Sequence, residues 1–382
     1  MSPGSNLVIE PGATIGILGS GQLGRMLAMA ARRLGYGVAV YSPEPNSPAG
    51  QLADQTTVAS YDDTTALEAF AQSVDVVTFE FENVSAEAVA VLSRFVPVRP
   101  GGTVLHTTQH RVREKTFLAS IEAPTTPWRA VKSLDELNDA LQLLGTPAIL
   151  KTAGFGYDGK GQRRIDDVGE AQVAFAALGS DDLILEAHVD FVRELSVVAA
   201  RGQDGCFVAY PIVENRHRNH VLDLTLAPAP FSADRVTLAR ALARRILDAL
   251  DVVGVLAVEL FEGRDGRLLV NELAPRPHNS GHFTLDACDV DQFELQLRAV
   301  CGLPLLEPRQ RCPAVMANLL GEDLLDSPDY AAVLASRDVR LHLYGKAVAR
   351  PGRKMGHLTA LGPTIEDALS KALTARNAIR RA

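Results

Sequence analysis

The first hundred residues alternate between short apolar runs and helical patterns, and this alternation constrains the fold more than any other feature of the sequence. ATIGIL (13–18) and VAVYS (38–42) are apolar enough for buried strands, and RMLAMAARRLG (25–35) carries an apolar stripe at helical spacing. The alternation continues through DDTTALEAFAQS (62–73), VDVVTFEFE (74–82) and SAEAVAVLSRF (85–95). Strands that alternate with helices pack into a parallel sheet. We therefore predict a doubly wound α/β domain that ends near RPGG, residues 99–102.

Length, charge and cysteine usage limit the classes of protein to consider. A chain of 382 residues predicts two or three domains. Its net charge of −8 argues against a general affinity for nucleic acid or for an acidic membrane surface, so we expect small-molecule partners. Four scattered cysteines without a Cys-x-x-Cys pair are typical of a reducing compartment. The sequence shows no signal-peptide pattern and no apolar run of the roughly 20 residues that span a bilayer. We expect a cytoplasmic protein.

The pattern changes near residue 109. QHRVREKTFLASIE (109–122) and SLDELNDALQLLG (133–145) predict helices, and the second opens with capping-box spacing between Ser133 and Glu136. Strand and helix patterns of mixed length follow, with a hairpin turn predicted at GQDG (202–205). The regular alternation of the first hundred residues therefore does not continue in this part of the chain.

The segment GVLAVELFEGRDGRLLVNEL (254–273) predicts a β-hairpin that brings two acids together. A two-residue turn at Asp265-Gly266 places Glu259 directly opposite Glu272, with both carboxylates on one face of the ladder. Like charges at that separation are destabilising, so a cation should lie between them, and Mg²⁺ takes one or two carboxylates and completes its shell with phosphate oxygens. The alternative is that twist or a bulge separates the two acids and leaves each of them solvated.

The segment KTAGFGYDGKGQ (151–162) predicts a phosphate-binding loop. Glycine lets the backbone N–H groups approach phosphate oxygens closely, and Lys151 and Lys160 add positive charge. The alternative is a flexible turn with solvated lysines. Together with the paired acids, the loop points to a nucleoside triphosphate. The GxxxxGK[ST] loop and the HRD and DFG signatures of protein kinases are absent from the sequence.

A competing signal comes from the first loop of the chain. Gly19, Gly21 and Gly24 fit the GxGxxG fingerprint of dinucleotide-binding proteins. That fingerprint also needs an acid at the end of the second strand, about 20 residues further on. Here the strand ends in Ser42, and Glu44 follows only after a proline. An NAD-dependent dehydrogenase is therefore a distant alternative.

Five stretches carry a resemblance to a known family: GQLGRM (21–26), TFEFENV (78–84), GYDGKGQ (156–162), VNELAPRPHNSGH (270–282) and RPGRKMGH (350–357). In this order they resemble the N5-carboxyaminoimidazole ribonucleotide synthase family of ATP-grasp enzymes. The resemblance implies an ATP-grasp fold, α/β overall and α+β in the lid, with an N-terminal pre-ATP-grasp domain. It divides the chain into a Rossmann-like domain (1–108), a lid or small domain (109–190), and a large domain with a C-terminal subdomain (191–382).

The same resemblance implies the activity and the site. The activity is ATP-dependent carboxylation of 5-aminoimidazole ribonucleotide (AIR) with bicarbonate in purine biosynthesis, with ATP and Mg²⁺ as cofactors and a homodimeric assembly. The implied ATP-binding residues are Arg111, Lys151, Gly156, Tyr157, Asp158, Gly159, Lys160, Gly161, Gln162, Glu186, Ala187, His188, Val189, Glu194, His217, Asn271 and Glu272. The implied substrate-binding residues are Gln22, Leu23, Glu80, Tyr157, Asp158, Arg276, Lys346, Arg353 and Lys354. The implied catalytic residues are Lys151, Lys160, Arg276, His278 and Asn279, and the metal ligands are Glu259 and Glu272.

Several alternatives stay open at this point. His278 either orients bicarbonate or fixes the loop that follows Glu272, and the basic run KAVARPGRK (346–354) either binds a phosphate or forms a solvated edge. His282 and His357 are interpreted as structural residues. The chain could also be another ATP-grasp carboxylase or amine ligase, or a nucleotide-binding regulatory module without turnover.

Overall fold

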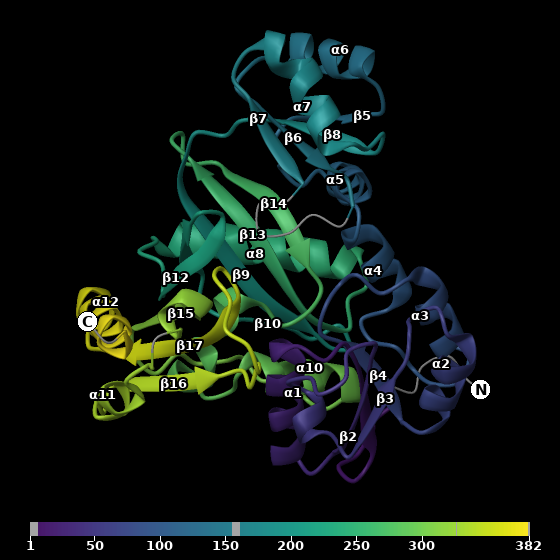
Figure 1. Cartoon of the computed structure of the whole chain (residues 1–382), viewed down its shortest axis with the longest axis vertical. Helices are drawn as coiled ribbons and strands as arrows, with labels where there is room; N and C mark the ends of the chain where they lie inside the picture. Colours follow the sequence, from purple (N-terminus) through teal and green to yellow (C-terminus); the bar gives the residue numbers. More distant parts are fainter. Residues whose placement is uncertain (1–6, 155–160, 326, 381–382) are drawn as a thin grey trace.

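The computed structural model describes residues 7–154, 161–325 and 327–380. Within these ranges the chain forms three sheets, whose strands come from residues 14–79, 128–187 and 191–361 (Figure 1). The predicted boundaries after residues 108 and 190 stay predictions. No helix of the described ranges is long and apolar enough to cross a membrane.

The N-terminal sheet confirms the predicted doubly wound α/β arrangement. Its parallel strands lie in the order β3-β2-β1-β4 and comprise β1 (Thr14–Leu18), β2 (Gly37–Ser42), β3 (Gln55–Val58) and β4 (Val76–Phe79). The helices of this part are α1 (Gln22–Arg33), α2 (Thr64–Gln72), α3 (Ala86–Leu92) and α4 (Gly102–Thr108). The side chains of Asp63 and Ser85 cap α2 and α3 by accepting backbone N–H groups of the first turn.

The two faces of this sheet are covered by helices from different parts of the chain. One face packs against α2 and α3. The other packs against α1 and against α10 (Gln292–Cys301), which follows α1 by more than 250 residues in sequence and lies beside it in Figure 1. Arg33 of α1 forms ion pairs with Asp291 and Glu294 at this contact. The late helix therefore ties the N-terminal sheet to the rest of the molecule.

The second sheet is small and antiparallel, in the order β5-β8-β6-β7. Its strands are β5 (Trp128–Val131), β6 (Ala148–Thr152), β7 (Gln162–Ile165) and β8 (Leu183–Ala187). Helices α6 (Leu134–Leu144) and α7 (Ala171–Leu178) bury one face, and Ser133 caps α6 as its spacing predicted. Helix α5 (Arg111–Ser120) lies between this sheet and the next one (Figure 1).

The third sheet is antiparallel and runs in the order β14-β13-β9-β11-β12-β15-β17-β16, with β10 paired to β9. Its strands are β9 (Phe191–Arg201), β10 (Phe207–Ala209), β11 (Val213–Arg218), β12 (Val221–Ala227), β13 (Gly254–Gly263), β14 (Leu268–Ala274), β15 (Ala314–Leu320), β16 (Val339–Leu343) and β17 (Lys354–Leu361). The helices around it are α8 (Ala233–Ala249), α9 (Thr284–Ala287), α10, α11 (Tyr330–Leu334) and α12 (Ile365–Ile379). Because β17 pairs with β15, the basic tail is joined to the sheet that carries the acidic hairpin.

Candidate active site

A cavity of about 1040 Å³ lies where the three sheets meet. Its lining includes Gln22 and Glu80 from the N-terminal part, Ile149 from the small sheet and Glu259 from the large sheet. The other predicted site residues that line it are Leu23, Arg111, Lys151, Gln162, Glu186, Ala187, His188, Val189, Glu194, His217, Asn271, Glu272, Arg276, His278, Asn279 and Lys354. The fold therefore gathers residues from all the predicted segments around one space.

Eight predicted site residues are not among those that line the cavity in the described part of the chain. Gly156, Tyr157, Asp158, Gly159 and Lys160 fall outside the described residues. Gly161, Lys346 and Arg353 are described but are not part of the cavity lining.

The predicted register of the hairpin is right at its open end and wrong near its turn. Ala257 pairs with Ala274 as predicted, but Leu260 pairs with Val270, one residue away from the predicted partner. The turn is a three-residue loop, residues 264–266, rather than the two-residue turn that we predicted, and Gly266 adopts a left-handed backbone with φ of 78°. Glycine at this position makes the longer loop favourable, and the sequence signal Asp-Gly does not distinguish the two turns.

A β-bulge restores the register before the open end. Between the pairs Leu260–Val270 and Val258–Leu273, both Asn271 and Glu272 lie opposite the single residue Glu259. A bulge was the alternative that would have separated the acids. Here it turns two consecutive side chains of β14 toward the cavity, so that Glu259 and Glu272 still line the same space.

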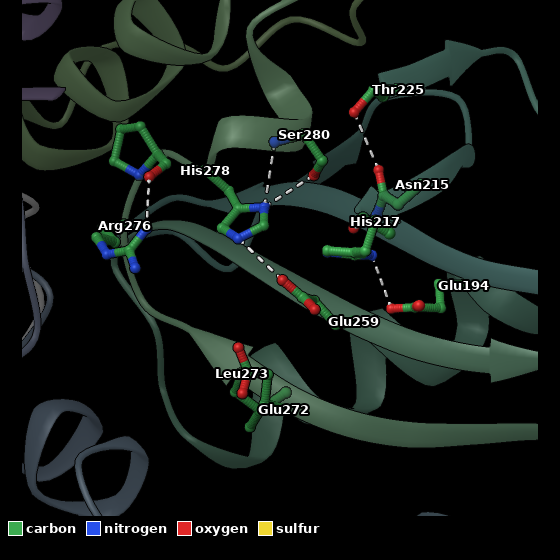
Figure 2. Close-up of polar contacts among 12 residues, drawn as sticks. Glu194, Asn215, His217, Thr225, Glu259, Glu272, Leu273, Arg276, His278 and Ser280 are labelled. Atoms are coloured by element: carbon green, nitrogen blue, oxygen red, sulfur yellow. Dashed lines mark hydrogen bonds and ion pairs between the residues drawn. The ribbon is translucent and has the colours of Figure 1, made fainter. Parts of the chain in front are cut away.

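Each acid of the hairpin has a positively charged or proton-donating partner. Nε2 of His278 lies 2.9 Å from Oε1 of Glu259 (Figure 2). Nδ1 of His278 accepts the backbone N–H of Ser280, so the ring proton on Nε2 is the one donated to Glu259. Burial raises the pKa of Glu259, but the hydrogen bond from His278 and the positive charge nearby outweigh it and leave the pKa below its ordinary value. His278 thus contacts the acid and the loop after β14 at once.

Glu272 is paired with Arg111 at the start of α5. Nη1 of Arg111 donates to Oε2 of Glu272 at 3.2 Å. The backbone N–H of Arg111 donates to the carbonyl of Ala153 at 2.8 Å, so the same residue contacts the strand that leads into the glycine loop. Burial lowers the pKa of Arg111, and the carboxylates of Glu272, Glu186 and Glu114 raise it further than burial lowers it.

A buried ion pair lies on the cavity face of the small sheet. Nζ of Lys151 donates to the carboxylate of Glu186, and Nζ of Lys115 lies 3.4 Å from the other oxygen of that carboxylate. Burial raises the pKa of Glu186, but the two lysines lower it to about 2. Burial lowers the pKa of Lys151 despite its partner. Sequence reasoning expected the backbone around Glu186 to matter and missed its side chain.

Aromatic side chains form an apolar wall that sequence reasoning also missed. Phe191 and Phe261 stack with ring centroids 4.6 Å apart, and both line the cavity. Phe261 lies two residues after Glu259 on β13, so strand alternation alone placed it on the same face. Beyond this wall Oε2 of Glu194 lies 2.9 Å from Nδ1 of His217 (Figure 2). Burial lowers the pKa of His217, but the carboxylates of Glu194 and Glu259 raise it above its ordinary value.

The first loop of the chain binds a carboxylate of the protein itself. Glu80 accepts the N–H of Gly21 at 2.6 Å and the N–H of Gly24 at 2.9 Å. A Cβ atom at Gly21 would lie 2.8 Å from Oε1 of Glu80, so glycine is needed for this approach. Burial raises the pKa of Glu80 although both N–H groups lower it. Because the carboxylate takes the position at the helix terminus that a dinucleotide pyrophosphate needs, the geometry argues against the dehydrogenase alternative.

Arg276 is held by an acid that the sequence analysis did not select. Glu82 forms a two-pronged ion pair with it, with contacts of 2.5 Å and 3.1 Å. Burial raises the pKa of Glu82, but Arg276 lowers it below its ordinary value. The signal was available, because TFEFEN carries acids at alternate positions at the end of β4.

The remaining predicted residues are Asn279, in the loop after β14, and three residues of the basic tail. Asn279 is buried, and neither atom of its side-chain amide has a hydrogen-bond partner among the described residues. Lys354 begins β17 and lines the cavity, and Nζ of Lys346 donates to its carbonyl at 2.7 Å. Nη1 of Arg353 donates to the carbonyl of Val348 at 2.9 Å. The basic tail is therefore folded back toward the cavity.

Models of known families match the chain along most of its length. A ribonucleotide synthetase preATP-grasp domain matches residues 12–109, an ATP-grasp domain matches 116–293, and a phosphoribosylaminoimidazole carboxylase C-terminal domain matches 314–371. These matches agree with the predicted ATP-grasp fold and its N-terminal pre-ATP-grasp domain.

Relatives and solved structures agree with the family matches. N5-carboxyaminoimidazole ribonucleotide synthase of Brucella melitensis is 46% identical over 93% of this chain and 98% of its own length. The Bacillus subtilis enzyme of the same name is 43% identical, with 93% of both chains covered.

An ADP complex of an N5-carboxyaminoimidazole ribonucleotide synthetase has a TM-score of 0.92 and 41% identity, covering 97% of this chain and 98% of that one. The Aspergillus clavatus enzyme in complex with ADP and 5-aminoimidazole ribonucleotide has a TM-score of 0.88 and 31% identity, covering 97% of this chain and 99% of that one. The chain therefore belongs to the N5-carboxyaminoimidazole ribonucleotide synthase family of ATP-grasp ligases.

Proposed function

We propose that the cavity performs the reaction of this family. The chain is an ATP-dependent ligase that carboxylates AIR with bicarbonate to N5-carboxyaminoimidazole ribonucleotide in purine biosynthesis. The observation that carries the residue assignments is that one continuous cavity is lined by the acidic hairpin, by Lys151 and by Lys354. Phosphate-binding lysines, metal-binding acids and the basic tail can therefore act on molecules bound side by side.

We place the ATP along the small sheet and the hairpin. The apolar wall of Phe191 and Phe261 offers a face for the adenine ring. The N–H groups of Ala187 and His188 already donate to the carbonyls of Pro127 and Pro147, so we assign the base-reading N–H to Val189. Glu194 is assigned to the ribose hydroxyls, with His217 holding its carboxylate.

The triphosphate is assigned to the charged end of the same groove. Lys151 and Arg111 both line the cavity, and each is already paired with an acid that orients it. Charge that develops on the transferring phosphoryl group is stabilised by these fixed cations without reorganisation. Gln162 lines the cavity where the glycine loop rejoins β7.

The donor set at the hairpin fits Mg²⁺. Glu259 and Glu272 supply carboxylate oxygens on one side of the cavity, with the amide of Asn271 between them. Mg²⁺ takes one or two carboxylates and completes its shell with phosphate oxygens and water, so two carboxylates are enough for it. When bound, Mg²⁺ would neutralise phosphate charge and polarise the phosphoryl oxygen that it contacts.

We place AIR between the N-terminal loop and the basic tail. Lys354 lines the cavity and is assigned to its phosphate, and Gln22 and Leu23 line the adjoining wall. Lys346, bonded to the carbonyl of Lys354, and Arg353 lie outside the lining and are assigned to add positive charge from the basic tail. Arg276, held by Glu82, and the unpartnered amide of Asn279 are assigned to bicarbonate. His278 is assigned to orienting Glu259, with its N–H directed at that carboxylate.

The proposed chemistry has two steps. An oxygen of bicarbonate attacks the γ-phosphorus, the bond to the bridging oxygen breaks, and ADP and carboxyphosphate result. The carbon–oxygen bond of carboxyphosphate then breaks to give CO₂ and phosphate. The exocyclic nitrogen of AIR forms a bond to the carbon of CO₂ and gives a proton to the departing phosphate. Walls that exclude water are needed because carboxyphosphate hydrolyses readily.

One assay tests the substrate assignment. ADP release is measured with AIR, with bicarbonate, with both and with neither, and the full rate is expected only with both. Full turnover with another amine in place of AIR would support a different ATP-grasp carboxylase or amine ligase. No turnover under any condition, together with tight ATP binding, would support a regulatory module.

Removing the amine of Lys354 is expected to weaken the binding of AIR but not that of ATP. Lys354→Ala should raise the KM for AIR by roughly 10- to 100-fold, because a charge-assisted hydrogen bond to phosphate contributes about 1.5–3 kcal/mol. The KM for ATP should change little. Steady-state kinetics with each substrate varied in turn measure the effect, and Lys132→Ala, an exposed lysine on the small domain, is the control with the same change of charge. A change confined to the KM for ATP would remove the tail from the substrate site.

The KM for AIR is also expected to depend on pH through Lys346. Burial, with Arg353 and Lys354 nearby, lowers the pKa of Lys346 to about 8, although Glu80 and Glu44 oppose the shift. As the pH rises through that value the amine loses its charge, so the KM for AIR should rise, by at most about tenfold per pH unit. Lys346→Arg keeps a charge at every pH tested and should flatten the profile. A rise that persists unchanged in Lys346→Arg would assign the titration to another group.

We also propose a cytoplasmic homodimer. All four cysteines are free in the structure, which supports a reducing compartment. The dimer follows from the family resemblance and is tested by sedimentation equilibrium, where a single species of monomer mass would contradict it.

A further inference from the structure

Two consecutive side chains of α5, Glu114 and Lys115, contact the backbone of β14 on either side of Glu272. We call this pair of side chains the clamp. Nζ of Lys115 donates to the carbonyls of Val270 and Asn271 at 3.2 Å and 3.0 Å. Oε2 of Glu114 accepts the N–H of Leu273 at 3.0 Å. Lys115 is 1% exposed and Glu114 is 3% exposed, so both are long polar side chains buried for these contacts.

The contacted backbone groups are those that surround the bulge. β14 is the end strand of the large sheet, and its outer edge meets the segment at Thr125 in an isolated bridge, where the N–H of Val270 donates to the carbonyl of Pro124 at 2.7 Å. A bulge also removes backbone groups from the ladder, and buried backbone groups require partners. The carbonyl of Val270 before the bulge and that of Asn271 within it accept from Lys115, and the N–H of Leu273 after it donates to Glu114. The two side chains therefore hold the strand on both sides of Glu272.

We propose that Glu114 and Lys115 are positioning residues that hold the bulge of β14, so that Asn271 and Glu272 both face the cavity and Glu272 meets the metal opposite Glu259. The inference rests on the proposed metal site. Without the bulge, strand alternation would turn Asn271 and Glu272 to opposite faces of the sheet. The bulge is therefore what allows both side chains to line the cavity.

The clamp also joins the hairpin to the triphosphate side of the cavity. Nζ of Lys115 lies 3.4 Å from Oε1 of Glu186, whose other oxygen is bonded to Lys151. One buried amine thus contacts both the carboxylate that holds Lys151 and the backbone carbonyl next to Glu272. Burial raises the pKa of Glu114 to about 8, with the charge of Glu272 adding to the shift and Lys115 and Arg111 opposing it. A glutamine amide matches the carboxyl in shape and keeps an oxygen that can accept the N–H of Leu273.

The test compares variants that remove or keep the clamp bonds. Glu114→Leu removes the acceptor, Lys115→Met removes the donor, and Glu114→Gln keeps an oxygen acceptor. Mn²⁺ binding is measured by electron paramagnetic resonance in the presence of ADP, and the Mg²⁺ dependence of ADP release is measured alongside it. Glu114→Leu and Lys115→Met are expected to weaken metal binding by roughly 10- to 100-fold, as loss of a group that orients a ligand does. Glu114→Gln should bind Mn²⁺ like the unaltered protein, and the KM for AIR should stay unchanged in all three.

Three outcomes would overturn the inference. Wild-type Mn²⁺ affinity in Glu114→Leu and Lys115→Met, with only a lower Tm, would make the clamp purely structural. An equal loss in Glu114→Gln and Glu114→Leu would show that the acceptor oxygen is not what matters. If Glu114→Leu does not fold, Glu114→Asp, which withdraws the same acceptor by one methylene, carries the test, and wild-type affinity there would count against the inference. Glu272→Gln is the reference, because unchanged Mn²⁺ binding in that variant would refute the metal assignment itself rather than the clamp.

Discussion

Glu272→Gln is expected to lower the rate of ATP-dependent ADP release by roughly 10³-fold or more. The amide keeps the shape of the side chain but removes the negative charge that would hold the metal, and metal assistance to phosphoryl transfer contributes several kcal/mol. It also removes the anionic partner of Arg111, because Nη1 of Arg111 donates to Oε2 of Glu272 at 3.2 Å in the unaltered protein. The measurement is coupled-enzyme detection of ADP at saturating AIR and bicarbonate.

The control for this variant lies on the same hairpin. Asp265→Asn removes one negative charge at the turn, where the side chain is exposed, and should leave turnover unchanged. Circular dichroism and Tm should be similar for both variants, because the carboxylate of Glu272 is partly exposed. Near-normal turnover in Glu272→Gln would mean that Glu272 is not a metal ligand, whatever its position in the cavity.

Lys151→Met is expected to lower kcat/KM for ATP by about 10²- to 10³-fold. The variant removes a fixed cation from the phosphate side of the cavity, and a preorganised donor to developing charge contributes on that scale. It also deprives buried Glu186 of its hydrogen-bonded partner and leaves only Lys115, at 3.4 Å. A lower Tm is therefore expected as well, because breaking a buried pair leaves an uncompensated charge.

A double variant separates these two effects. Lys151→Met with Glu186→Gln removes the stranded charge, so the Tm should recover relative to Lys151→Met alone while turnover stays low. Recovery of turnover together with the Tm would show that Lys151 acts through stability and does not contact the phosphates. Scanning calorimetry and initial rates on the same preparations provide both measurements.

Elements that depend on neighbouring residues could be predicted from the sequence. Strands β1, β2 and β4 and helices α1, α2 and α3 lie where their periodicity predicted them, because each depends on neighbours a few residues away. Strand β3 and helix α4 lie in segments for which we predicted neither. The hairpin was also predicted, but its register was not. Val258–Leu273 is paired as expected, whereas the three-residue turn and the compensating bulge shift the pairs between them. Both acids face the cavity because the bulge reverses the one-residue shift in register that the longer turn introduces. No local sequence pattern encodes this pair of shifts.

The sequence did not reveal residues whose role depends on a partner far away in the chain. Glu82 was not selected, although it holds Arg276, because the two are 194 residues apart in the sequence. Glu80 was assigned to substrate, and its bonds to Gly21 and Gly24 also account for those glycines. The GxGxxG pattern therefore indicates that some group comes close to the backbone of this loop. Only the fold decides whether that group is a cofactor phosphate or, as here, the side chain of Glu80.

The sequence by itself determined the local elements, the glycine loop, the acids on one hairpin and the family, since these are set by spacing and residue type. Only the tertiary structure decided that α10 covers the N-terminal sheet, that the basic tail returns to the cavity beside β15, and that Lys115 and Glu114 reach the bulge. The physical reason is that burial and hydrogen bonding between segments far apart in the chain depend on the packing of the whole molecule. Short-range periodicity carries no information about which distant backbone group a buried polar side chain will meet.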